Sequence, residues 1–169
     1  MAGVGDSIEK AVHYLSEHPE EARYTDSFAR ATLGEALRVE VAGPKGERIV
    51  TDMPEGVGGR AEEPSPGWLF RAALASCVAT TIGMEAARDG VKLSSLEVEV
   101  DSESDDRGIL GMDEAVPAGP LSTRIRIRGR ADGMGDGALR ELLERGAGRC
   151  PVCDATKRAV EVSLEFETS

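Results

Sequence analysis

Residues 65–90, SPGWLFRAALASCVATTIGMEAARDG, form the stretch that decides the fold. Ser65 followed by Pro66 is a strong signal for the start of a helix, because serine caps the free amides of the first turn and proline fits the first helical position. Arg71 is the only charged side chain before the last two turns, so apolar residues cover every face. A helix of this kind is buried, and Gly90 is a suitable place for it to end.

Short segments that alternate apolar and polar residues flank this helix in the sequence and are predicted to be strands. They are residues 28–33, 36–41 and 48–53 before it, and 93–103, 121–130 and 160–167 after it. Turns at Gly34-Glu35 and at residues 43–46 suit antiparallel hairpins. Further helices are predicted over about 6–22 with a bend at Pro19, over 137–147, and from Pro151.

The predicted order αβββαββααβ is typical of an α+β protein in which antiparallel sheets surround a long buried central helix. Sheets this short cover such a helix on one side only. A second copy of the chain is the simplest cover for the other side, so a homodimer is expected. Residues 1–26 are interpreted as an N-terminal helical extension, and residues 27–169 as the domain that carries the function.

The composition argues against several kinds of partner. The chain has 169 residues, with 31 acidic and 20 basic side chains and a formal net charge of -11. Nucleic acids and anionic membranes are bound through lysine and arginine, so neither is an expected partner. No apolar run approaches the ~20 residues that span a bilayer, and the first 25 residues are charged throughout, which speaks against a signal peptide. The expected location is therefore cytoplasmic.

Arginines alternate along residues 121–130 and share one face of the predicted strand: Arg124, Arg126, Arg128 and Arg130. Acidic residues alternate in the same way along 93–103 and 160–167. Opposite charges that face each other across antiparallel strands are stabilising, and like charges are destabilising. The arginines are therefore predicted to pair with those acids, which leaves no basic surface for an anion.

Three cysteines are the most reactive side chains of the sequence. Cys77 lies in the long helix, and Cys150 and Cys153 form a Cys-x-x-Cys pair beside the predicted last helix. Three cysteines are too few, and odd in number, for a disulfide scaffold. A structural zinc site needs four ligands, but both histidines lie in the N-terminal helix, so no metal or other cofactor is expected. Free cysteines also occur simply as small buried apolar side chains.

A dithiol oxidoreductase is an alternative function for the Cys-x-x-Cys pair. Cys150 would cap the last helix, where free amides and the helix dipole lower the pKa of a thiol. The strand–helix–strand unit that usually precedes such a motif is missing from the sequence, which weakens this interpretation.

Two separated stretches resemble the signature of the OsmC/Ohr family, the osmotically induced and organic hydroperoxide resistance proteins. One is Gly58-Gly59 followed by PSPGWLFRAALASC at residues 64–77, and the other is Cys150-Pro151-Val152. The resemblance covers about residue 28 to the end, and the predicted order of elements agrees with it. It implies an OsmC-like peroxidase domain in an intertwined homodimer, which reduces organic hydroperoxides and, to some extent, hydrogen peroxide.

The resemblance also implies roles for two cysteines. Cys77 matches the peroxidatic residue, whose thiolate attacks the peroxide and becomes a sulfenic acid, and Cys150 matches the resolving residue, which condenses with it as a disulfide. A dithiol reductant of the lipoyl or thioredoxin type then reduces that disulfide. Cys77 is too far from the helix start to gain from the dipole, and burial would raise its pKa, so it needs a cation. The family uses an arginine of the first hairpin, for which Arg38 is the first choice and Arg30 the second.

Two positions depart from the family pattern. Gly67 stands where members carry a glutamate that holds the arginine, and Glu62 or Glu63 could take over that task. Cys153 stands where many members have serine or another small residue, and it offers Cys150 a different disulfide partner. Two alternatives to the peroxidase therefore stay open: a small-molecule-binding or stress-associated module of the same fold with decayed chemistry, and a Cys-x-x-Cys dithiol oxidoreductase.

Overall fold

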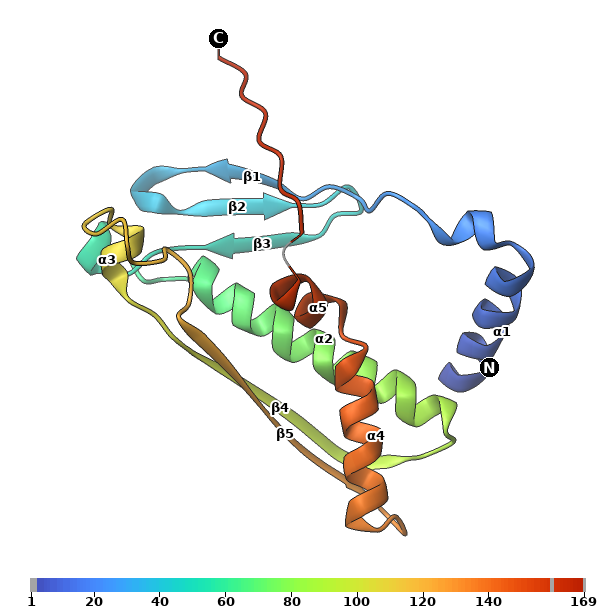
Figure 1. Ribbon diagram of the computed structural model, residues 1–169. Helices are drawn as coiled ribbons and strands as arrows, with labels where there is room; N and C mark the ends of the chain where they lie inside the picture. The colour runs from blue at the N-terminus through green and yellow to red at the C-terminus, as the bar shows by residue number, and fades with distance from the viewer. Residues whose placement is uncertain (1–2, 159, 169) are drawn as a thin grey trace. The chain divides into compact units, whose positions relative to one another are not determined.

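The computed structural model describes residues 3–158 and 160–168 (Figure 1). They form two compact units, one of residues 6–73 and one of residues 74 onward together with the chain up to residue 5. The long predicted helix is α2, Pro66–Arg88, which passes from one unit into the other. The α+β class with antiparallel sheets and a long helix is confirmed. The assignment of residues 1–26 as an extension stays a prediction.

The first unit holds a surface helix and a three-stranded antiparallel sheet. Helix α1, Val4–Glu17, ends before Pro19, which begins a 3-10 turn, and no described side chain of either is buried. The strands lie in the order β1-β2-β3. Their bounds are Arg30–Leu33 for β1, Val39–Ala42 for β2 and Arg48–Thr51 for β3.

The connection between β1 and β2 differs from the predicted hairpin turn at Gly34-Glu35. A 3-10 turn occupies Glu35–Leu37, and both Ala36 and Leu37 take the left-handed conformation, with φ of 50° and 63°. Residues in that conformation cannot continue a strand. Strand β2 therefore begins at Val39 and not at residue 36.

The core of the second unit lies along one stripe of α2. Its apolar members recur every four residues, which places them on one helix face. They are Leu74, Val78, Ile82 and Ala86, and all four are buried. By length and apolarity alone α2 could span a bilayer, contrary to the expectation from the sequence. Within the described chain α2 packs on this one stripe, and it is not buried on every face as the sequence predicts.

Helix α4, Asp136–Gly148, crosses α2 at a contact between the two backbones. A Cβ on Gly146 would lie only 2.6 Å from the Cα of Ile82, so glycine is the residue that allows this approach. An ion pair accompanies the crossing, in which Oε1 of the buried Glu85 is 3.1 Å from Nε of the exposed Arg145. The hydrogen bond from Arg145 holds the pKa of Glu85 below its ordinary value, although burial acts in the opposite direction.

Strands β4, Leu93–Glu103, and β5, Ser122–Ala131, form the long antiparallel pair that the alternating pattern predicts. The connection between them contains a short helix that the sequence did not indicate, α3, Asp106–Ile109. The ion pairs across the two strands are Arg124–Asp101 at 3.2 Å, Arg126–Glu99 at 2.6 Å and Arg128–Glu97 at 2.6 Å. The predicted pairing of these three arginines with the acids of 93–103 is confirmed.

The prediction of a last strand at residues 160–167 is wrong for the single chain. Residues 160–168 pair with no strand of the described chain, and Figure 1 draws them as a red tail without an arrow. The alternation is present, but its apolar members are all exposed: Val160, Val162, Leu164 and Phe166. A strand needs a partner edge, and among the described residues this segment pairs with the edge of neither sheet. The acids of the tail therefore do not join the arginines of β5.

Candidate active site

The second unit brings the three cysteines together at the start of helix α5, Pro151–Lys157. Cys150 is the N-cap of this helix, and its sulfur accepts a hydrogen bond from the backbone N–H of Cys153 at 3.3 Å. The thiol of Cys150 is also within hydrogen-bond reach of the thiols of Cys77 and Cys153. All three are free thiols. The two cysteines that the resemblance singles out thus form one cluster, and Cys153 belongs to it.

Backbone features place Cys150 beside Cys77. Pro151 takes the first position of α5, where its missing N–H costs no hydrogen bond, and this starts a new helix directly after α4. The crossing of Gly146 on Ile82 lies four residues before Cys150 and five residues after Cys77. The close approach of α4 to α2 therefore brings the start of α5 to the turn of α2 that carries Cys77.

The three thiols differ in their readiness to lose a proton. Burial raises the pKa of Cys77, and only the backbone N–H of Val152 acts against this. Burial acts on Cys150 as well, but the N–H of Cys153 and the hydrogen bond from the Cys77 thiol outweigh it and lower its pKa. Burial, followed by the neighbouring Cys150, raises the pKa of Cys153 to about 11. The first proton therefore leaves Cys150.

Access to solvent ranks the thiols differently. Cys77 is half-buried, whereas Cys150 is 1% exposed and Cys153 is 7% exposed. A reagent that arrives from solvent therefore meets Cys77 first, while the buried Cys150 is the thiol that loses its proton more readily. The hydrogen bond between these two thiols connects the accessible sulfur to the more acidic one.

Arg38 lies in the first unit and is held by two carboxylates. Its guanidinium is 3.0 Å from Glu63 Oε1 and 3.6 Å from Glu62 Oε2. These are the two acids expected to replace the family glutamate missing at Gly67, so the chain does hold this arginine with carboxylates. Cys77 lies in the other unit, and activation of Cys77 by Arg38 stays a prediction.

Asp52, which the sequence did not single out, organises the loop that carries these carboxylates. It follows β3 and is 1% exposed. Its carboxylate accepts hydrogen bonds from the backbone N–H groups of Met53 at 2.7 Å, Arg60 at 3.2 Å and Glu62 at 3.2 Å. Burial raises the pKa of Asp52, but the three amides outweigh it and lower the pKa. An acid just after a strand resembles any loop residue, so the sequence offers no signal for this role.

A family model described as OsmC-like protein matches residues 59–165. The chain belongs to the OsmC-like family. An organic hydroperoxide resistance protein of Xanthomonas axonopodis pv. citri is 29% identical over 147 residues, which are 86% of this chain and 96% of that protein.

Solved structures share the fold. The OsmC-like protein of Mycoplasma pneumoniae superposes with a TM-score of 0.67 at 15% identity, over 81% of this chain and 91% of that one. An organic hydroperoxide resistance protein, OsmC, of Legionella pneumophila gives a TM-score of 0.59 at 18% identity, over 80% and 91%. All three cysteines of this OsmC-like protein lie inside the matched region, and Arg38 precedes it.

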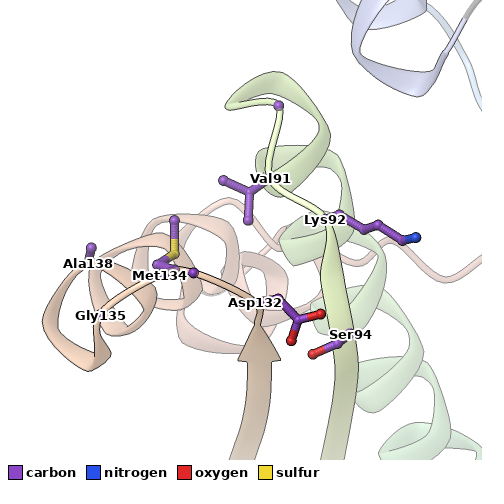
Figure 2. Close-up of a pocket in the computed structure, with 9 residues that line it drawn as sticks. Val91, Lys92, Ser94, Asp132, Met134, Gly135 and Ala138 are labelled. Atoms are coloured by element: carbon purple, nitrogen blue, oxygen red, sulfur yellow. The ribbon is translucent and has the colours of Figure 1, made fainter.

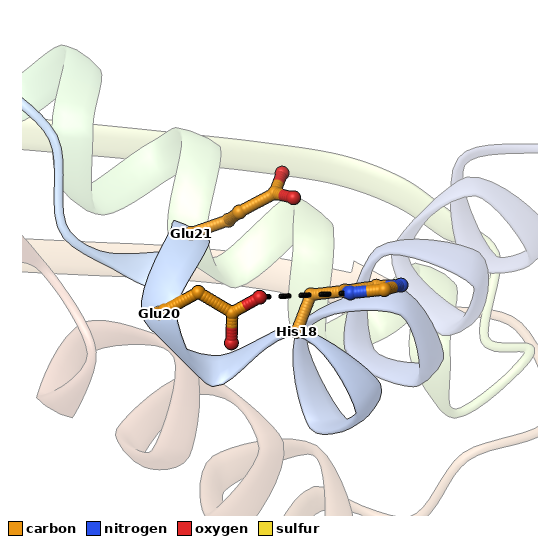
Figure 3. Close-up of side chains that lie close together, drawn as sticks. All are labelled: His18, Glu20 and Glu21. Atoms are coloured by element: carbon orange, nitrogen blue, oxygen red, sulfur yellow. Dashed lines mark ion pairs between the residues drawn. The ribbon is translucent and has the colours of Figure 1, made fainter.

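A cluster with metal-ligand side chains lies on the N-terminal surface of the OsmC-like protein, away from the cysteines in sequence. His18, Glu20 and Glu21 place one ligand atom each within 4.8 Å of the others (Figure 3). Their atoms already have partners, since His18 Nδ1 is 3.7 Å from Glu20 and the Tyr14 hydroxyl donates to Glu21 at 2.7 Å. The carboxylates are exposed, and these contacts account for the cluster without a metal ion.

Two cavities flank β4 and β5 in the second unit. The first, of about 620 Å³, lies where β4 begins and β5 ends. Figure 2 shows Ser94 and Asp132 side by side at these strand ends and the Lys92 amine pointing away from them. No cysteine lines it. The second cavity, of about 650 Å³, is lined by Cys153, by apolar side chains of α2, β5 and α4, and by charged side chains of α4 and α5.

Proposed function

We propose that this OsmC-like protein reduces organic hydroperoxides, with Cys77 as the attacking thiol and Cys150 as the resolving thiol. The observation that carries the proposal is the contact between the half-buried Cys77 and the fully buried Cys150. The Cys77 sulfur is accessible to a peroxide, and the neighbouring Cys150 can attack the sulfenic acid that forms on it. The Xanthomonas relative, which matches over almost its whole length, is named for organic hydroperoxide resistance.

The proposed reaction balances over the two thiols. The Cys77 thiolate attacks one peroxide oxygen, the O–O bond breaks, and the alkoxide takes up a proton and leaves as an alcohol. Cys77 is then a sulfenic acid. The Cys150 thiolate attacks its sulfur, the S–O bond breaks, and hydroxide leaves as water after protonation. A dithiol of the lipoyl or thioredoxin type returns two electrons and two protons by thiol–disulfide exchange.

Cys77 must first lose its proton, and Arg38 is proposed as the cation that makes this favourable. A guanidinium beside a thiol favours the thiolate and lowers its pKa. The hydrogen bond to Cys150 supplies a route for the proton, because the Cys150 thiolate can accept it and pass it to the departing alkoxide. Cys150 is a thiolate again when the sulfenic acid has formed, which is the state needed to attack it.

A peroxide assay tests the proposal directly. Reduced protein with a dithiol present should consume cumene hydroperoxide or tert-butyl hydroperoxide catalytically, measured as peroxide loss and alcohol formation. Protein whose thiols have been alkylated with N-ethylmaleimide is the control and should be inactive. Consumption no faster than with the dithiol alone would contradict the proposal and favour a binding module of the same fold.

One observation favours dithiol oxidoreductase activity as a second candidate. Cys150 has the lowered pKa and the N-cap position that suit the attacking thiol of a Cys-x-x-Cys motif. In that case the Cys77→Ser variant would still carry out thiol–disulfide exchange with a small disulfide substrate and would keep its activity. The peroxidase needs Cys77, so the same variant separates the two functions.

We also propose a cytoplasmic homodimer. On α2, Trp68 and Met84 are exposed on faces that the chain itself leaves open, and the apolar side chains of residues 160–168 have no cover. Burial of each large apolar side chain contributes about 1.5–3 kcal/mol, so covering several of them suffices for association. Light scattering at micromolar concentration should give twice the chain mass of 17.9 kDa. A monomer at that concentration would rule out the dimer.

A further inference from the structure

Cys153 is a buried thiol that the proposed peroxidase reaction does not use. It lies one helical turn after Cys150, its N–H donates to the Cys150 sulfur, and its thiol is within hydrogen-bond reach of the same sulfur. Cys150 therefore has a thiol neighbour on each of two elements, Cys77 on α2 and Cys153 on α5. A sulfur placed between two others can form a disulfide with either.

The cavity of about 650 Å³ gives Cys153 an environment of its own. Its apolar lining includes Val78, Ile127 and Leu143, and its charged lining residues are Arg140, Glu144 and Lys157. Cys153 is the one cysteine that lines this cavity. Cys77, on α2, is half-buried and does not line it. A disulfide that includes Cys153 would thus face a space large enough for a small dithiol.

We propose that Cys153 is a second resolving thiol that moves the disulfide from the peroxide side of the cluster to this cavity. The inference rests on the proposed peroxidase reaction. The Cys153 thiolate attacks the Cys150 sulfur of the Cys77–Cys150 disulfide. That S–S bond breaks, the Cys150–Cys153 bond forms, and Cys77 leaves as a thiolate. One disulfide replaces another, so no outside oxidant or reductant enters this step.

The local chemistry sets the order of the two disulfides. The Cys-x-x-Cys spacing at a helix start is the one with which dithiol oxidoreductases close a disulfide. In the reduced protein the pKa of Cys153 is raised to about 11 by burial and by the neighbouring Cys150, so Cys153 is protonated. Once Cys150 is in a disulfide its negative charge is gone, and one of these causes disappears. Burial remains, but the pKa of Cys153 falls once the first disulfide has formed, which favours its attack on Cys150.

The exchange has a consequence for stoichiometry when no reductant is present. It frees the Cys77 thiolate, which can attack a second peroxide. Two equivalents of cumene hydroperoxide per chain should therefore both be consumed by the unchanged protein. The Cys153→Ser variant retains the Cys77–Cys150 disulfide and should consume one equivalent. Cys153→Ala, which fills the same buried position without a hydroxyl, is the second variant and should also stop at one.

Peptide mapping of the unchanged protein provides a readout that needs no variant. After one equivalent of peroxide and alkylation at successive times, the Cys77–Cys150 disulfide should appear first and decline as Cys150–Cys153 rises. One equivalent consumed by all forms, with only Cys77–Cys150 recovered, would overturn the role of Cys153 and leave the peroxidase intact. No consumption by any form would overturn the peroxidase itself. Recovery of Cys150–Cys153 in Cys77→Ser protein after peroxide treatment would show that the exchange from Cys77 is not the source.

Discussion

Replacing Cys77 with serine should abolish the consumption of organic hydroperoxide, whereas Cys150→Ser should leave one turnover. A hydroxyl at position 77 cannot form a sulfenic acid, but the loss of Cys150 removes only the partner that resolves it. Cys150 also contributes to the raised pKa of Cys77, so the first attack should remain possible without it. Rapid-mixing measurements of peroxide loss, with dimedone to trap the sulfenic acid, distinguish the two variants.

Cys150 could also be the attacking thiol, and the same two variants distinguish this assignment from the proposed one. Cys150 carries the lower pKa, so it would be the attacking thiol if acidity mattered more than access. In that case Cys150→Ser would block the first turnover and Cys77→Ser would not. The assignment of the two roles would then be inverted.

Replacing Arg38 with methionine should slow the first turnover by about 10- to 1,000-fold at neutral pH. An opposite charge in contact lowers a thiol pKa by about 1–3 units, and each unit is tenfold in thiolate below the pKa. Without the guanidinium the pKa of Cys77 rises, so the inflection of the rate against pH should move to higher pH. The midpoint of that profile under single-turnover conditions is the quantity to measure.

Arg48, on β3, provides the control for Arg38, and Arg30, on β1, is tested as the alternative. Arg48 pairs with Glu40 on the neighbouring strand, and Arg48→Met makes the same chemical change without touching the carboxylates that hold Arg38. Its pH profile should be unchanged. Arg30, whose guanidinium lies 5.1 Å from the ring centre of Phe28, is the competing assignment. A shifted profile for Arg30→Met and an unshifted one for Arg38→Met would transfer the role to Arg30.

The parts of the fold that the sequence predicts correctly are those with local signals. Ser65 and Pro66 start α2 where the capping pattern places them, and the Ser65 hydroxyl accepts a hydrogen bond from the N–H of Trp68 at 3.2 Å. The alternation along β4 and β5 predicts both strands, and even their cross-strand ion pairs, because register and charge repeat with the same period. These features depend on residues that are close in sequence, or on the pairing of two strands with matching charge patterns.

The parts that could not be predicted depend on distant backbone. Residues 160–167 have the pattern of a strand, but the sequence does not reveal that they pair with no strand of the described chain. The contact of Cys150 with Cys77 was expected only through the family resemblance, since the crossing at Gly146 that produces it has no local signal. The role of Asp52 is hidden in the same way, because its hydrogen-bond donors lie up to ten residues ahead.

The backbone contact between Gly146 and Ile82 also bears on how the protein tolerates mutation. Apolar side chains in a core can be exchanged for others of similar volume at small cost, since neighbours repack. Backbone atoms cannot repack, so the spacing between α2 and α4 at this crossing does not depend on which side chains fill the space around it. Conservative substitutions elsewhere in the core of this protein should therefore leave the thiol cluster in place, with the sulfurs of Cys77 and Cys150 in contact. A side chain at residue 146 should disrupt the cluster and separate these two sulfurs.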